Sequence, residues 1–170
     1  DRQIVGHQIN NNGKLVESFR LQAHQSPIHS ILALDNSRLV SCDSEGRLML
    51  WEANQSGTMQ VVQSVDTKQV GPNTLYQMAK NDDGSHIAVS IGEEVWIVKS
   101  DDRKVVVKIQ VKVPVSSVLF AQGLLVCTGA SVCLVYDPQE HYNIRYTSPS
   151  LPDKIFSCAI LPIEQGKSLL

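Results

Sequence analysis

The stretch from Ser26 to Ala53 constrains the fold more than any other part of this chain. It holds three short apolar runs, at residues 28–34, 39–42 and 48–51, separated by clusters of Asp, Asn, Ser, Glu and Gly. Apolar runs of strand length between such turn residues predict an antiparallel meander with tight turns. Because both faces of the runs are apolar, we expect the sheet to be covered on both sides.

The same pattern continues along the chain and predicts an all-β fold of repeated four-stranded antiparallel units. We letter the strands of each unit a to d in chain order. We expect one partial domain over residues 1–170, made of the end of one unit (1–21), three full units (26–65, 75–113 and 115–147) and the start of another (155–170). The predicted strands lie at residues 3–9, 14–21, 28–34, 39–42, 48–51, 58–65, 75–80, 86–91, 94–99, 104–113, 115–121, 124–128, 132–137, 143–147 and 155–163.

Residues 104–113 show the most regular strand pattern. Apolar side chains at every odd position alternate with a set that includes Lys108, Gln110 and Lys112. A period of two indicates a strand with one face in water. Its lysines suit an edge strand that must not pair with another chain.

The ends of the predicted c strands align as a repeat. Trp51-Glu52, Val98-Lys99 and Tyr136-Asp137 fall in one column, with spacings of 47 and 38 residues. A period of about 40–45 residues is typical of propeller blades. Trp96 lies two positions before this column and faces the same way, because side chains alternate along a strand.

With Trp51-Glu52 where the family has Trp-Asp, and Ala23-His24 where it has Gly-His, the chain resembles the WD-repeat β-propeller family. The resemblance implies a β-propeller of four-stranded antiparallel blades. It also implies a structural network that links a His before strand a, a Ser or Thr in strand b, an Asp in the b–c turn and the Trp of strand c. The matching positions are His24, Ser41, Asp43 or Glu45, and Trp51; Glu45 is the better positional match because it precedes Gly46.

We expect Trp51 to bury its ring between blades, with its indole N–H bonded to a buried acceptor. Val98 and Tyr136 replace the Trp in the later units, so the repeats are degenerate. Tyr136 is therefore expected to fill a structural position in its blade.

In this family the d–a and b–c loops usually form the rim that binds partners. Here those loops are short, and Pro72, Pro149 and Pro152 stiffen them. Stiff loops on a rigid sheet can bind a peptide or protein with little ordering cost. The rim residues that we expect to face a partner are Gln25, Asp43, Ser44, Asn73, Glu93, Ser131 and Lys154.

Our leading hypothesis is a non-enzymatic protein–protein interaction module or scaffold within a larger scaffold, trafficking or signalling protein. Its partner would be a protein or peptide, alongside other domains of the same polypeptide. The alternative is an internal structural brace that packs on other domains of its own chain. A propeller enzyme is the third hypothesis: His24, Ser41 and Asp43 have the residue types of a hydrolytic triad, but no nucleophile elbow accompanies them.

Charge and composition argue against several classes of ligand. The formal net charge of -2 argues against a nucleic-acid or anionic-membrane surface. No apolar run approaches the ~20 residues that span a bilayer, so we expect no membrane insertion. Acidic pairs in the turns lack the spacing of a calcium loop, and we expect no cofactor.

The chain opens at Asp1 without Met or a signal-peptide pattern, which predicts a piece of a longer polypeptide. The two half units at its ends could pair residues 3–9 beside 167–170 and close a four-bladed ring. We expect instead a segment of a larger ring.

Four cysteines, Cys42, Cys127, Cys133 and Cys158, form no Cys-x-x-Cys pair. Their apolar surroundings predict reduced thiols in strands, and hence a protein of the cytosol or nucleus; we expect a cytoplasmic location. A turn at Gly129-Ala130-Ser131 would place Cys127 opposite Cys133 across a hairpin. We expect these two thiols to be reduced, mostly buried and facing one another.

Overall fold

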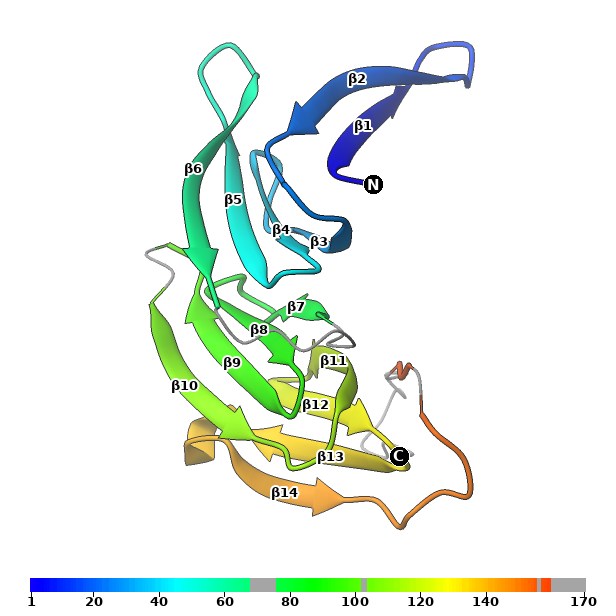
Figure 1. Ribbon diagram of the computed structural model, residues 1–170, viewed down its shortest axis with the longest axis vertical. Helices are drawn as coiled ribbons and strands as arrows, with labels where there is room; N and C mark the ends of the chain where they lie inside the picture. Colours follow the sequence, from blue (N-terminus) through cyan, green and yellow to red (C-terminus); the bar gives the residue numbers. More distant parts are fainter. Residues whose placement is uncertain (68–75, 102–103, 156, 160–170) are drawn as a thin grey trace. The chain divides into compact units, whose positions relative to one another are not determined.

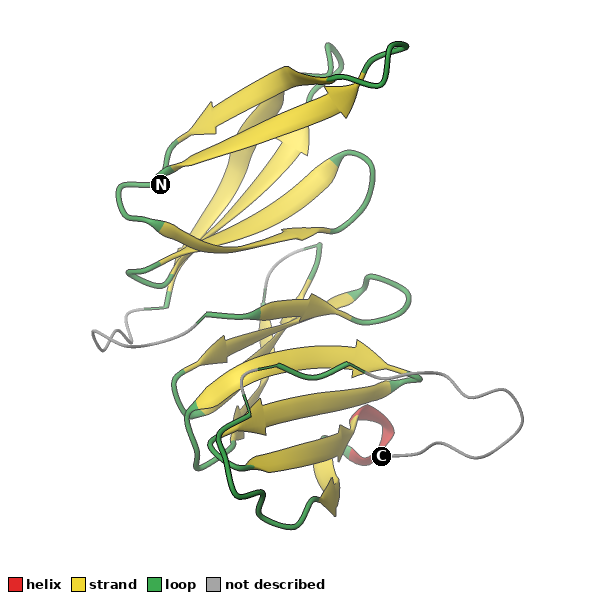
Figure 2. Cartoon of the chain, turned by 90° about the vertical axis from the view of Figure 1, so that its right-hand side faces the viewer, coloured by secondary structure: helices red, strands yellow, loops and turns green. Residues whose placement is uncertain are grey.

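The computed structural model describes residues 1–67, 76–101, 104–155 and 157–159 of the chain. The described residues form two compact units, Asp1–Tyr76 and Gln77–Leu170. Within each unit the strands pair antiparallel, and the regular structure is almost wholly strand (Figures 1 and 2). The predicted all-β architecture of four-stranded sheets is confirmed.

The first unit contains a hairpin and one complete sheet (Figure 1). Its strands are β1 (Gln3–Ile9) and β2 (Leu15–Gln22), followed by β3 (Ile28–Ala33), β4 (Arg38–Asp43), β5 (Arg47–Ala53) and β6 (Met59–Asp66). Ile4 and Leu21 of the hairpin pack against Met49 and Trp51 of β5. The hairpin therefore covers one face of the sheet with apolar side chains, which is why the strands of this sheet carry apolar residues on that face.

The second unit contains two complete sheets whose strands run in chain order. They are β7 (Met78–Lys80), β8 (His86–Ile91), β9 (Glu94–Lys99) and β10 (Val105–Gln110), and then β11 (Val115–Ala121), β12 (Leu124–Gly129), β13 (Val132–Asp137) and β14 (Asn143–Thr147), with the 3-10 turn η1 (Pro138–Glu140) before β14. Ala88 and Ile97 from one sheet share a buried cluster with Leu125 and Leu134 from the other. Each sheet of this unit thus supplies half of a common core.

A β-bulge recurs between the c and d strands of all four ladders. In the first complete sheet, Leu50 pairs with Gln63 and Trp51 pairs with Val61, so Val62 is the extra residue on strand d. The same one-residue shift falls at Gly6/His7, at Ile97/Val98 and at Val135/Tyr136. Bulges increase the local twist of an edge strand. Because the bulge marks the same column, it supports the predicted alignment of Trp51, Val98 and Tyr136 and adds His7 to it.

Several strand boundaries differ from the prediction by one or two residues, and the predicted strands at 75–80, 104–113 and 155–163 differ by more. β10 ends at Gln110 rather than at residue 113, because the Val111 amide leaves the ladder to bond Glu93 O and Lys112 adopts a positive φ of 65°. The predicted strand was too long because apolar and polar residues keep alternating after Gln110, where the chain turns. Residue 75 and most of the predicted strand at 155–163 lie outside the described residues; Ile155 and residues 157–159 are described and are not strand. The proposed pairing of residues 3–9 with 167–170 also lies outside them.

The predicted pairing of Cys127 with Cys133 is wrong. Cys127 pairs with Leu134, and Thr128 pairs with Cys133, because the loop holds two residues rather than three. Gly129 stays in the ladder opposite Val132, and the positive φ of 47° at Ala130 makes the tighter turn. A shift of one residue puts adjacent side chains on opposite faces, so the two thiols do not face one another. Cys127 is buried and Cys133 is half-buried, and all four cysteines are free thiols.

Among the described residues, no helix is long and apolar enough to cross a membrane.

Candidate functional site

Beneath the b–c turn of the first complete sheet lies a chain of four buried polar side chains. The Trp51 indole N–H donates to Ser41 Oγ at 2.8 Å, Ser41 Oγ lies 2.6 Å from His24 Nε2, and His24 Nδ1 lies 2.9 Å from Asp43 Oδ2. The four side chains come from strand c, strand b, the d–a connection and the last residue of strand b. A His24 ring that carries its proton on Nδ1 satisfies every donor and acceptor in this chain.

Asp43 connects this network to the b–c turn. Its Oδ1 accepts hydrogen bonds from the backbone amides of Glu45 (3.0 Å) and Arg47 (2.9 Å), while Oδ2 is the His24 partner. An aspartate that accepts from the amide two residues on forms a local turn, and this turn chemistry fixes the hairpin. The network therefore holds strand b, strand c and the d–a connection in one register.

The structure corrects the preference for Glu45 as the His24 partner. The Glu45 side chain is exposed, whereas Asp43 is only 1% exposed and makes the bond. Asp43 pairs with Ile28 at the end of strand b, so its side chain points under the turn, whereas Glu45 lies in the loop itself. The sequence also predicted that Asp43 faces a partner at the rim. That prediction is wrong, because the Asp43 side chain is buried.

Ser41, His24 and Asp43 have the order of bonds of a hydrolytic triad, but they have no room for its chemistry. Ser41 is fully buried and its oxygen already accepts from Trp51. A nucleophile must reach a substrate carbonyl, and a hydroxyl enclosed between His24 and Trp51 offers no such approach. The constellation can hold the fold together and cannot attack an ester or amide.

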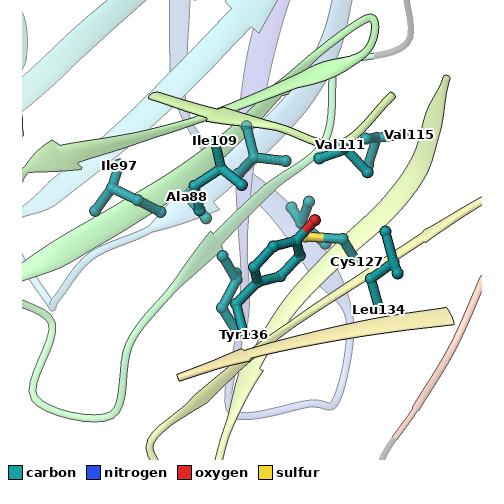
Figure 3. Close-up of a cluster of buried hydrophobic side chains, with 11 residues drawn as sticks. Ala88, Ile97, Ile109, Val111, Val115, Cys127, Leu134 and Tyr136 are labelled. Atoms are coloured by element: carbon teal, nitrogen blue, oxygen red, sulfur yellow. The ribbon is translucent and has the colours of Figure 1, made fainter. Parts of the chain in front are cut away.

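In the last sheet the same positions are apolar. Tyr136 occupies the bulge column of Trp51, and Cys127 lies on strand b two residues before Gly129, as Ser41 lies two before Asp43. Val111 precedes the first residue of strand a by four positions, as His24 does. Figure 3 shows Val111, Cys127 and Tyr136 in one cluster. The sequence pattern assigned Tyr136 to this column but did not assign Val111 or Cys127 to the equivalent positions. The available signals were the distance of Val111 from strand a and the distance of Cys127 from the end of strand b.

The Tyr136 hydroxyl is buried and has no hydrogen-bond partner among the described residues. Burial, with a smaller contribution from the neighbouring Cys127, raises the pKa of Tyr136 to about 12. Burial likewise raises the pKa of the Cys127 thiol to about 12. A weak thiol in place of a serine thus leaves this sheet with packing where the first complete sheet has a hydrogen-bonded network.

Backbone hydrogen bonds tie the b–c turns to the d–a connections. In the second unit, Val111 N donates to Glu93 O and Val115 N to Gly92 O; Leu151 N donates to Ser131 O and Ile155 N to Ala130 O, at 2.7 to 2.8 Å. In both cases the two donor residues are four positions apart, so the two b–c turns are tied to their d–a connections in the same way. In the first unit, Ile28 N donates to Asp1 O as Val115 N donates to Gly92 O, and the β1–β2 ladder carries a bulge like that of the c–d pairs.

The remaining predicted rim residues are mostly accessible. Gln25, Glu93 and Lys154 are exposed, and Ser44 and Ser131 are partly exposed. The Ser131 hydroxyl lies 2.9 Å from that of Ser150, which joins the b–c turn to the d–a connection a second time. Asn73 lies outside the described residues. No group of three or more His, Cys, Asp or Glu side chains that could hold a metal ion occurs in the described part of the chain.

Comparison with known proteins gives a fold. No family model matches the sequence, and no curated protein matches it. The structure is similar to that of U3-55K, with a TM-score of 0.66 and 19% identity over 79% of this chain and 42% of that one. It is also similar to the crystal structure of the WD40 β-propeller domain of Doa1, with a TM-score of 0.63 and 14% identity over 81% of this chain and 45% of that one. The chain spans less than half the length of either structure and has a WD40-like β-propeller fold.

Proposed function

From the WD40-like propeller fold and its rim, we propose that this chain is a non-enzymatic protein-interaction module. Its binding surface is the rim formed by the b–c turns and the d–a connections, and its partner is a protein or peptide. A place in a scaffold, trafficking or signalling protein, and a cytoplasmic location with the four thiols reduced, belong to the same proposal.

One observation carries the proposal: the rim of the second unit presents exposed side chains on anchored backbone. Leu151 is 46% exposed although its own amide is bonded to Ser131 O. Pro149 and Pro152 flank it and fix φ in the connection, and Lys154 follows close by. An apolar side chain held outward on a stiff loop loses little conformational freedom when it meets a partner, which favours binding.

Site-specific photo-crosslinking tests this proposal. A benzoylphenylalanine at position 154 should capture a discrete protein in its native cells, and Leu151→Ser in the same protein should abolish the capture. The matched control is a benzoylphenylalanine at position 55, an exposed residue in the c–d turn of the first complete sheet. That position should give no adduct with the same protein.

The outcomes separate the interaction module from the internal brace. Adducts between position 154 and other parts of the same polypeptide, with no second protein, would contradict a partner-binding rim and support the brace. Equal capture from positions 154 and 55 would mean that the rim has no special role.

A further inference from the structure

A cavity of about 460 Å³ lies in the second unit, at the strand ends opposite the rim. It is bounded by the a–b turns of both sheets, by the connection between β13 and β14, and by one residue of β10. Its lining residues are Asn81, Asp82, Asp83, Ser85, His86, Val106, Phe120, Gly123, Pro138, Gln139 and Tyr142. The volume exceeds that of one side chain and falls within the range of ligand sites.

Two carboxylates line the cavity. Asp82 and Asp83 are exposed neighbours in the a–b turn of the β7–β10 sheet. Asp82 Oδ2 accepts from Gly123 N of the next sheet at 3.3 Å, and Asp83 Oδ1 accepts from Ser85 N at 2.8 Å. Hydrogen bonds from Ser85 hold the pKa of Asp83 below its ordinary value. Each carboxylate keeps lone pairs for a ligand, because one amide bond uses only part of its acceptor capacity.

Apolar and aromatic side chains also line the cavity. Phe120 and Tyr142 are half-buried against the core, and Val106, the extra residue of the β10 bulge, is 49% exposed. Tyr142 holds an uncommon left-handed backbone with φ of 59°, and its amide donates to Asp137 O at 2.8 Å. The fold thus keeps an aromatic ring on the cavity wall at a conformational cost for a bulky residue.

None of the described residues that line the cavity is Lys or Arg. Among the described lining residues, the two carboxylates therefore face no permanent cation. His86, whose Nδ1 lies 2.8 Å from Ser85 Oγ, is a smaller cause of the lowered pKa of Asp83 than the Ser85 hydrogen bonds. A cation from another molecule would complete the charges. The apolar wall would cover the methylene stem that carries such a cation.

We propose that this cavity binds an arginine side chain of a protein partner. A guanidinium is planar, donates two parallel hydrogen bonds to carboxylates and stacks on aromatic rings, so it suits a cavity lined by a carboxylate pair and by Tyr142. A lysine ammonium is a compact, strongly hydrated point charge and uses neither the stacking surface nor the paired acceptors. The site lies at the other strand ends from the rim, so it is a second contact surface and does not depend on the function proposed above.

The test uses small probes against the whole protein. Nα-acetyl-arginine methylamide is titrated in ligand-observed NMR, beside its citrulline and lysine counterparts. Citrulline has nearly the same shape without the charge. We expect the arginine probe to bind at least tenfold more tightly than citrulline and several-fold more tightly than lysine, with weakening as salt is added.

Two variants locate the binding. Asp82→Asn with Asp83→Asn keeps an oxygen acceptor for Gly123 N and Ser85 N while it removes both charges, and it should lower arginine affinity at least tenfold. Tyr142→Asn removes the ring but suits the left-handed backbone, and it should lower the affinity for arginine more than that for lysine. Glu52→Gln, at an exposed position in the first unit, is the matched control and should change nothing.

Three results would overturn the proposal. They are equal binding of arginine and citrulline, equal binding of arginine and lysine, or arginine binding that survives the double Asp variant. Thermal unfolding of each variant, measured alongside, separates loss of the site from loss of the fold.

Discussion

Trp51 and Ser41 are joined by a hydrogen bond of 2.8 Å from the indole N–H to the hydroxyl oxygen, and neither exposes more than 3% of its surface. The bond orients a large ring that packs on Ile4, Leu21 and Met49. The network and the apolar cluster are therefore one structure, with the polar edge of the indole in the first and its ring in the second.

Trp51→Ala should lower the free energy of unfolding by about 3–5 kcal/mol, because it loses transfer energy and leaves a cavity. Denaturant unfolding followed by circular dichroism measures this loss. Val62→Ala, at the 42% exposed bulge residue of the neighbouring strand, is the control and should cost less than about 1 kcal/mol. Similar losses for the two variants would contradict a structural role for Trp51.

Asp43→Ala should lower the free energy of unfolding by at least about 3 kcal/mol. It leaves His24 Nδ1–H and the amides of Glu45 and Arg47 without their acceptor, and an unsatisfied buried donor costs about 1–3 kcal/mol. Glu45→Ala, two residues away and exposed, should stay within about 0.5 kcal/mol. A larger loss of stability for Glu45→Ala than for Asp43→Ala would indicate that Glu45 is the network residue.

Gly46 and Gly57 separate backbone strain from steric overlap. Both have positive φ, of 76° and 78°, but a Cβ on Gly46 would lie 2.4 Å from Thr67 Oγ1 and 2.8 Å from the Tyr76 hydroxyl, whereas none of the described atoms lies within 4 Å of a Cβ on Gly57. Gly57→Ala should cost about 1 kcal/mol through its left-handed backbone. Gly46→Ala should cost about 1–3 kcal/mol more, in thermal unfolding of the two variants side by side. Equal losses of stability in the two variants would show that the Thr67 and Tyr76 side chains move aside without an energetic penalty.

Asp35 should stabilise the protein in a pH-dependent way. Hydrogen bonds from the Ser37 amide and from Arg38 lower its pKa from 3.8 to about 2. A lowered pKa contributes stability that is present above about pH 4 and is lost as the pH falls through about 2. Because the Asp35 side chain is 41% exposed, solvent screening reduces this contribution to about 0.5–1 kcal/mol.

Asn54 provides the neutral control for Asp35. Its Oδ1 accepts from Ser56 N, Ser56 Oγ and Thr58 N, as Asp35 Oδ1 accepts from Ser37 N, Ser37 Oγ and Arg38 N. Urea unfolding at several pH values should show the cost of Asp35→Ala shrinking between pH 4 and 2, and the cost of Asn54→Ala staying constant. Parallel curves would assign the Asp35 effect to turn geometry rather than charge.

The buried thiols should destabilise the fold in alkali. Burial raises the pKa of Cys42 and Cys127 from 9.0 to about 12. Above pH 9 the unfolded chain releases these protons first and binds fewer protons than the folded protein, so stability falls as the pH rises towards 12. Each thiol contributes a slope of up to about 1.4 kcal/mol per pH unit.

The combined Cys42→Ala and Cys127→Ala variant should show a shallower loss of stability with pH than the unmodified protein. The difference between the two slopes cancels the titration of the lysines, which both proteins share. Urea unfolding from pH 8 to pH 11 measures the slopes. Identical slopes would mean that both thiols already titrate at their ordinary pKa in the folded protein.

The sequence by itself determined most of the strands, the order of the sheets and the column that holds Trp51, Val98 and Tyr136. These follow from local chemistry: apolar runs of strand length, turn residues between them, and a period that repeats along the chain. The same local signals predicted three residues of the network, since His24 lies before strand a, Ser41 in strand b and Trp51 in strand c, where the family pattern has them.

Only the tertiary structure decided between Asp43 and Glu45, and between a two-residue and a three-residue turn at Ala130. Both choices depend on where a neighbouring strand ends and which backbone amides it leaves to be satisfied, and residues distant in the sequence set those ends. The cavity beside Asp82 and Tyr142 was also beyond sequence reasoning, because its walls come from two sheets that meet through packing. A sequence pattern fixes which face of a strand is apolar, but packing fixes what that face meets.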